Sequence, residues 1–143
     1  MSIEKEITCK LSGEMQQNAL DFVTFLRNVG MTTHAQHQTA FEYKGKWVCI
    51  LIINDGGWML FDNPITKHFN DYTLDEDLRA FALAHVNICT TGHCDSSPGL
   101  SKTILGKTFE NVCTSEVAFF DPSAEVLNNV KRLIEIWIAD TKN

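Results

Sequence analysis

The sequence lacks several features that would assign it to a broad class of protein. No run of apolar residues approaches the length of a membrane-spanning helix, and the segment Met1–Glu6 carries no apolar signal core. Lysine and arginine number 12 against 18 aspartate and glutamate residues, so the net charge is −6 and no basic face is available for nucleic acid. We therefore expect a cytoplasmic protein that binds neither membranes nor nucleic acids.

The cysteines do not form the pattern of a secreted, disulfide-linked scaffold. The chain has five cysteines, an odd number, and contains no C-x2-C pair. Cytoplasmic thiols are kept reduced by the cellular thiol pool. We therefore expect thiols rather than a disulfide framework, and a core that is stable without covalent cross-links.

Length and composition are those of one folded domain. The chain has 143 residues, of which 44% are hydrophobic and 21% charged, and this is enough to bury a sizeable core. No internal repeat or linker interrupts it. We expect residues 1–143 to form a single α+β domain with an antiparallel β-sheet, a meander plus C-terminal strands. An N-terminal, a middle and a C-terminal helix would pack against this sheet.

Helical periodicity occurs in three places. Apolar residues at helical spacing follow Ser12 and end at Gly30, which predicts the N-terminal helix. The segment Thr73–Glu76 matches a capping box, in which the threonine hydroxyl and the glutamate carboxylate would satisfy two orphan amides of the middle helix. Asp121 and Pro122 are expected as the N-cap and first residue of the C-terminal helix.

Strand patterns fill the intervals between these helices. Ile3 and Ile7 suggest a short leading strand, and residues 41–61 predict an antiparallel meander with turns at Lys44–Lys46 and Asn54–Gly57. Aromatic residues on these adjacent strands are mostly expected in the core. If their covering is incomplete, they would line an apolar ligand pocket. The pocket candidates are Tyr43, Trp47, Trp58 and Phe61.

The residues with metal chemistry are concentrated between His85 and Cys113. Thiolate sulfur and imidazole nitrogen are the preferred ligands of zinc. His85 and Cys89 are four residues apart and would share one face if the middle helix continued through them. Cys94 follows across a glycine-containing turn, and Cys113 could return from a neighbouring strand. The pattern predicts a zinc site formed by Cys89, Cys94, Cys113 and His85, with His93 competing for the nitrogen position; no other cofactor is expected.

Two alternatives compete with the zinc hypothesis. Cys94 has His93 and Asp95 beside it, which are the residue types that activate a thiolate, so the chain could be a thiol-dependent enzyme or a redox sensor. Alternatively the cysteines are buried small hydrophobes, and the protein is an apolar small-molecule-binding domain. No pair of acidic residues marks an acid–base site, which favours a binding or regulatory module over an enzyme. The partner would be a small molecule or a protein, with a homodimer left open.

The segment from about His85 to Trp137 resembles a group of small uncharacterised bacterial proteins that are common in Firmicutes. Their C-terminal half carries a cysteine-rich turn with Pro-Gly, a GK-F-NVC signature, a strand and an Asp-Pro helix start. The matching residues are Cys89, Cys94, Pro98, Gly99, Gly106, Lys107, Phe109, Asn111, Val112, Cys113, Phe119, Asp121, Pro122, Ala124 and Glu125. Members often have more cysteines in the turn than this chain, and the resemblance implies no activity.

Overall fold

The structure is a computed structural model that describes residues 2–34, 39–61, 74–88 and 100–141. The elements in chain order are α1 (Ile3–Lys10), α2 (Gly13–Asn28), β1 (Thr32–Thr33), β2 (Ala40–Tyr43), β3 (Lys46–Asn54), β4 (Gly57–Phe61), α4 (Glu76–Ala84), β5 (Val86–Ile88), β6 (Leu100–Ile104), β7 (Lys107–Phe120) and α5 (Ala124–Thr141). The expected α+β class, with N-terminal, middle and C-terminal helices, is confirmed. Within the described ranges, no helix has the length and apolar character needed to cross a membrane.

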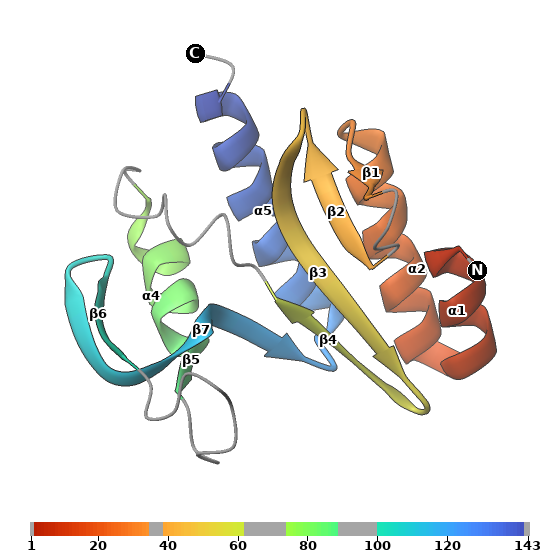
Figure 1. Cartoon of the computed structure of the whole chain (residues 1–143), viewed down its shortest axis with the longest axis horizontal. Helices are drawn as coiled ribbons and strands as arrows, with labels where there is room; N and C mark the ends of the chain where they lie inside the picture. Colours follow the sequence, from red (N-terminus) through yellow and green to blue (C-terminus); the bar gives the residue numbers. More distant parts are fainter. Residues whose placement is uncertain (1, 35–38, 62–73, 89–99, 142–143) are drawn as a thin grey trace.

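The strands pair antiparallel in one sheet, in the order β1–β2–β3–β4–β7–β5, and β6 pairs with β7 beside this path (Figure 1). The predicted meander is confirmed as β2, β3 and β4. The long strand β7 then joins the meander from the far end of the chain. Leu60 of β4 is paired with Leu51 on one side and with Phe119 of β7 on the other. This pairing places the end of β7, and the start of α5 after it, beside the first residues of β4.

Helices α2 and α5 cover the same face of the sheet and lie behind it in Figure 1. Trp58 of β4 packs against Phe22 of α2, with 6.3 Å between the ring centroids. Tyr43 of β2 meets Trp137 of α5 edge to face at 5.8 Å. Large aromatic residues remove the most apolar surface from water, so these contacts form the centre of the core.

The N-terminal segment is the helix α1, so the expected leading strand is wrong. Ile3 and Ile7 are both fully buried. Residues four apart share a face in a helix and also in a strand, and their spacing could not distinguish the two. The helical choice has local support, because the Ser2 hydroxyl accepts a hydrogen bond from the backbone N–H of Lys5 at 3.2 Å. The C-terminal carbonyl of this helix, at Lys10, accepts from the N–H of Gly56 in the β3–β4 turn.

An ion pair fastens α1 to α2. The Arg27 guanidinium donates two hydrogen bonds of 2.9 Å to the two carboxylate oxygens of Glu4. Hydrogen bonding by this cation lowers the pKa of the Glu4 carboxyl. Both side chains are partly exposed, so solvent screening limits the contribution of the pair to less than about 1 kcal/mol.

The helix ends agree with the sequence in one case and differ in two. The predicted start at Ser12 and stop at Gly30 are confirmed for α2. Helix α4 begins at Glu76, and its N-cap is Asp75, whose carboxylate accepts a hydrogen bond from the N–H of Leu78 at 2.8 Å. Thr73, the predicted N-cap, lies outside the described residues. Asp121 does not cap α5. Ser123 does so instead, since its hydroxyl oxygen accepts from the backbone N–H of Val126 at 3.2 Å.

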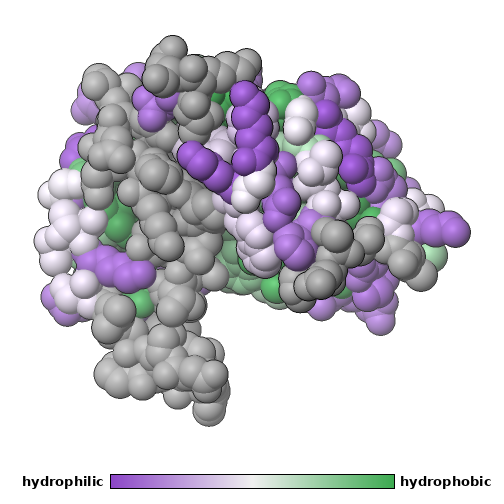
Figure 2. Space-filling model, turned by 45° about the horizontal axis from the view of Figure 1, so that its top comes forward, coloured by the Kyte–Doolittle hydropathy of each residue, from purple (hydrophilic) through white to green (hydrophobic). Residues whose placement is uncertain are grey.

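Hydrophilic side chains dominate the described surface on one face of the molecule, with hydrophobic residues in small patches between them (Figure 2). The large apolar side chains that are exposed among the described residues are Trp47, Ile52, Ile88 and Phe120. Phe120 is the most exposed of them, at 61%. Its ring meets Phe61 edge to face at 6.4 Å on the side of the sheet opposite to the helices.

Two neighbouring residues of β3 test which face the helices cover. Leu51 is fully buried and Ile52 is 37% exposed, because successive side chains of a strand point to opposite faces. We expect Leu51→Ala to lower the free energy of unfolding by about 2–5 kcal/mol through the cavity it leaves. Ile52→Ala should cost less than about 1 kcal/mol. Urea unfolding would measure both, and equal losses would contradict the assignment of the faces.

Candidate functional site

The turn between β7 and α5, residues Asp121 to Ser123, is held in place by strand β4. The Asp121 N–H donates to the Trp58 carbonyl at 2.8 Å, and the Trp58 N–H donates to Asp121 Oδ1 at 2.7 Å. Asp121 has a positive φ of 44°, a conformation that aspartate tolerates better than most residues. A Cβ on Gly57 would lie 3.1 Å from Asp121 Oδ1, so the missing side chain permits this close approach.

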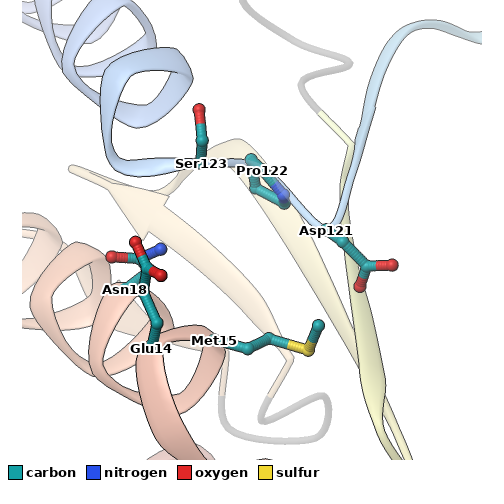
Figure 3. A pocket seen from close by; sticks show the side chains of 6 residues that line it. All are labelled: Glu14, Met15, Asn18, Asp121, Pro122 and Ser123. Atoms are coloured by element: carbon teal, nitrogen blue, oxygen red, sulfur yellow. The ribbon is translucent and has the colours of Figure 1, made fainter.

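Two hollows border this turn. The first, which we call the Glu14 hollow, has a volume of about 330 Å³ and lies between the turn and the start of α2 (Figure 3). Its lining residues are Glu14, Met15, Asn18, Asp121, Pro122 and Ser123. In Figure 3 the side chains of Glu14 and Asn18 lie beside one another, whereas the carboxylate of Asp121 points away from them. The Asp121 carboxylate is therefore not aimed into the Glu14 hollow.

The second hollow, which we call the His85 hollow, also borders this turn and lies between it and the end of α4. Its volume is about 390 Å³. Its lining residues are His85, Ala118, Phe119, Phe120, Asp121, Pro122, Ser123 and Val126. They come from the end of α4, the end of β7 and the first turn of α5. The His85 hollow thus combines an apolar wall with an imidazole, a carboxylate and a hydroxyl, which is the usual composition of a small-molecule site.

The ring of His85 is held by two neighbouring phenyl rings and at one nitrogen. Its centroid lies 4.6 Å from the ring of Phe81 and 4.8 Å from that of Phe119. Its Nδ1 lies 2.9 Å from the carbonyl oxygen of Phe81. A carbonyl oxygen can only accept a hydrogen bond, so this contact places a proton on Nδ1. In the neutral ring, Nε2 is then a hydrogen-bond acceptor.

The structure keeps His85 as a candidate but overturns the argument that grouped it with Cys89. Helix α4 ends at Ala84, His85 is its C-cap, and Val86–Ile88 is a strand. A helical face shared by residues 85 and 89 therefore does not exist. Along an extended strand the three steps from His85 to Ile88 span roughly 10 Å, about twice the separation of helical neighbours four residues apart.

The thiol candidates stay predictions. Cys89, His93 and Cys94 lie outside the described residues, and of Cys113 only the backbone in β7 is described. In the part of the chain that the structure covers, no group of three or more His, Cys, Asp or Glu side chains could hold a metal ion. The zinc site of Cys89, Cys94, Cys113 and His85, and the reactive thiol at Cys94, are therefore untested by the described geometry.

The aromatic pocket candidates are divided between the two faces of the sheet. Tyr43 and Trp58 are buried in the core against α5 and α2. Trp47 is 39% exposed and packs beside His34 at 5.4 Å, and Phe61 packs against Phe120. Strand alternation sends these residues in opposite directions, so the structure does not bring the four together.

Sequence reasoning missed the residues that give the His85 hollow its polar groups. Asp121 and Pro122 were recognised only as a helix start, and Ser123 was not singled out. Serine is a preferred N-cap residue, so Ser123 was a local signal for the start of this helix. Its hydroxyl oxygen accepts from the N–H of Val126, three residues later. No local signal indicates that His85 lies beside this turn, because strand pairing between β5 and β7 brings them together.

The chain matches no protein-family model, no curated protein and no solved structure. The resemblance of residues 85–137 to small Firmicutes proteins therefore stays a prediction.

The turn itself can be tested with two substitutions of Asp121. We expect Asp121→Ala to lower the free energy of unfolding by about 1–3 kcal/mol, because the Trp58 N–H loses its acceptor and alanine tolerates the positive φ poorly. Asp121→Asn keeps an acceptor oxygen and the conformational tolerance, and should stay within about 0.5 kcal/mol of the parent. Urea unfolding measures both; equal stability of the two variants would contradict the role assigned to the Asp121 side chain.

Proposed function

We propose that the protein is a small-molecule-binding domain whose ligand occupies the His85 hollow. The observation that carries this proposal is the fixed imidazole of His85. Its Nδ1 is engaged by the Phe81 carbonyl at 2.9 Å, and its Nε2 has no hydrogen-bond partner among the described residues. This corresponds to the third expectation from the sequence, an apolar small-molecule binder, but at a different place from the strand aromatics.

Preorganisation supports this proposal. Phe81 and Phe119 are stacked at 5.6 Å with an interplanar angle of 13°, and each also contacts the imidazole. A ring held in this way loses little conformational entropy when a ligand binds to it. The His85 side chain therefore presents its acceptor nitrogen in one orientation, as a specific binding site requires.

The size and the apolar lining of the hollow also fit a small ligand. A volume of about 390 Å³ lies in the range of roughly 300–1,000 Å³ that is typical of small-molecule sites. The buried Phe119 forms the apolar wall of the hollow on the core side. Val126 and Pro122 add aliphatic surface from the start of α5. A ligand with an apolar body and one polar group would match this lining.

Filling the hollow from α5 tests this function. Val126 lines the hollow, whereas Asn128, two residues further along the same helix, is exposed. We expect Val126→Phe to weaken the binding of small aromatic compounds at least about tenfold, because the larger ring occupies their space. Asn128→Phe adds the same ring elsewhere and should leave binding unchanged.

The measurement is a titration of the ¹⁵N-labelled protein with a panel of small aromatic compounds, followed by backbone NMR shifts. The proposal expects shifts centred on His85, Phe119 and Phe120, and their loss in Val126→Phe. The proposal would be overturned if no compound shifted these residues, or if Val126→Phe and Asn128→Phe bound the compounds equally well.

A zinc-binding role is the second candidate, and one feature of the sheet favours it. Ile88 of β5 and Leu100 of β6 are both paired with Val112, on opposite sides of β7. Cys89 follows Ile88 directly in the chain, and Cys113 follows Val112. The pairing thus supports the expectation that Cys113 returns on a strand next to the segment that carries Cys89 and Cys94. With His85 at the ligand hollow, His93 becomes the favoured nitrogen ligand.

Elemental analysis beside native mass spectrometry tests the zinc site on protein purified without chelator or metal-affinity tag. The zinc role predicts about one zinc ion per chain, lost in Cys89→Ser and in Cys113→Ser because two thiolate ligands are removed. Cys9→Ser, at an exposed position of α1, is the matched control and should keep the metal. Metal-free protein with five titratable thiols would rule the site out.

A further inference from the structure

We infer that the ligand of the His85 hollow is a small apolar amine, bound as its ammonium ion. This inference rests on the proposed function and names the chemical class that the hollow would select. It follows from the hydrogen-bonding character and the charge of the lining, and from the aromatic surface beside them.

The polar groups that line the hollow are predominantly acceptors. His85 Nε2 is an acceptor in the neutral ring, because Nδ1 donates to the Phe81 carbonyl. Asp121 uses Oδ1 to accept from the Trp58 N–H, and its Oδ2 has no hydrogen-bond partner among the described residues. The Ser123 oxygen accepts from the Val126 N–H at 3.2 Å and, like any hydroxyl, has a second lone pair. An ammonium group brings three N–H donors, which is the complement of such a set.

The charge of the lining favours a cation over an anion. Among the described residues, the lining includes the Asp121 carboxylate and no lysine or arginine. The start of α5 opposes this carboxylate with a partial charge of about +0.5 from its helix dipole. A full negative charge outweighs that half charge, and Glu125 in the first turn of α5 adds a second carboxylate near the helix end. An anionic ligand would meet net repulsion here.

The apolar lining supplies a place for the carbon skeleton of the amine. Phe119 forms part of the buried wall, and Pro122 and Val126 line the hollow from the start of α5. An amine whose carbon skeleton packs on Phe119 and Val126 would bring its nitrogen toward Asp121. A neutral alcohol of the same skeleton could use the apolar wall but offers one donor and no charge.

Three matched compounds test the inference: 2-phenylethylamine, 2-phenylethanol and phenylacetate, titrated at neutral pH and followed by the NMR shifts of the hollow residues. We expect the amine to bind about tenfold more tightly than the alcohol, and phenylacetate to bind most weakly, because only the amine gains charge-assisted hydrogen bonds. Asp121→Asn, which keeps an acceptor for the Trp58 N–H, should lower the affinity for the amine about tenfold and leave that for the alcohol unchanged.

Glu14→Gln is the control, since Glu14 lines the neighbouring Glu14 hollow and not the His85 hollow. It removes one negative charge and should leave amine binding unchanged. If the alcohol binds as tightly as the amine, or if Asp121→Asn binds the amine like the parent, the amine inference is overturned while the ligand-binding function stands. If none of the compounds shifts the hollow residues, both are overturned. A thermal melt of Asp121→Asn that matches the parent would confirm that its binding reports on charge and not on unfolding.

Discussion

The pairing between Trp58 and Asp121 is the interaction on which the rest of the site depends. Two hydrogen bonds, of 2.8 and 2.7 Å, join the first residues of β4 to the end of β7. Asp121 reverses the chain there with a positive φ, and Ser123 then begins α5 as its N-cap. Both hollows border this turn. If the turn moved, the lining of the proposed ligand site would move with it.

Two tryptophans of the core bury a polar group together with their large apolar surface. The indole N–H groups of Trp58 and Trp137 are buried without a hydrogen-bond partner among the described residues. Each such group costs about 1–3 kcal/mol. Burying an indole removes roughly 150–250 Å² of surface, which contributes about 4–6 kcal/mol at 25 cal/mol per Å². The hydrophobic gain is the larger quantity, so these two residues stabilise the packing of α2 and α5 on the sheet despite their unpaired donors.

The structure removes the reason for which the sequence grouped His85 with Cys89. The spacing of these two residues suggested a shared helical face, but the helix ends at Ala84 and the chain continues as β5. No glycine or proline marks this end. It is set by pairing with β7, in which the Ala118 N–H donates to the His85 carbonyl at 3.2 Å. A helix that is ended by a distant strand leaves no signal in its own periodicity.

The sequence by itself determined the elements whose causes are local. The helix between Ser12 and Gly30, the meander and its tight turns all follow from caps, spacing and turn residues within a few positions of one another. Tertiary structure alone decided that β7 lies between β4 and β5, that Tyr43 and Trp58 face the core whereas Trp47 and Phe61 do not, and that His85 lines one hollow with the start of α5. The reason is that pairing between strands dozens of residues apart depends on the free energy of the whole sheet and its covering helices. No short segment of the sequence contains that information.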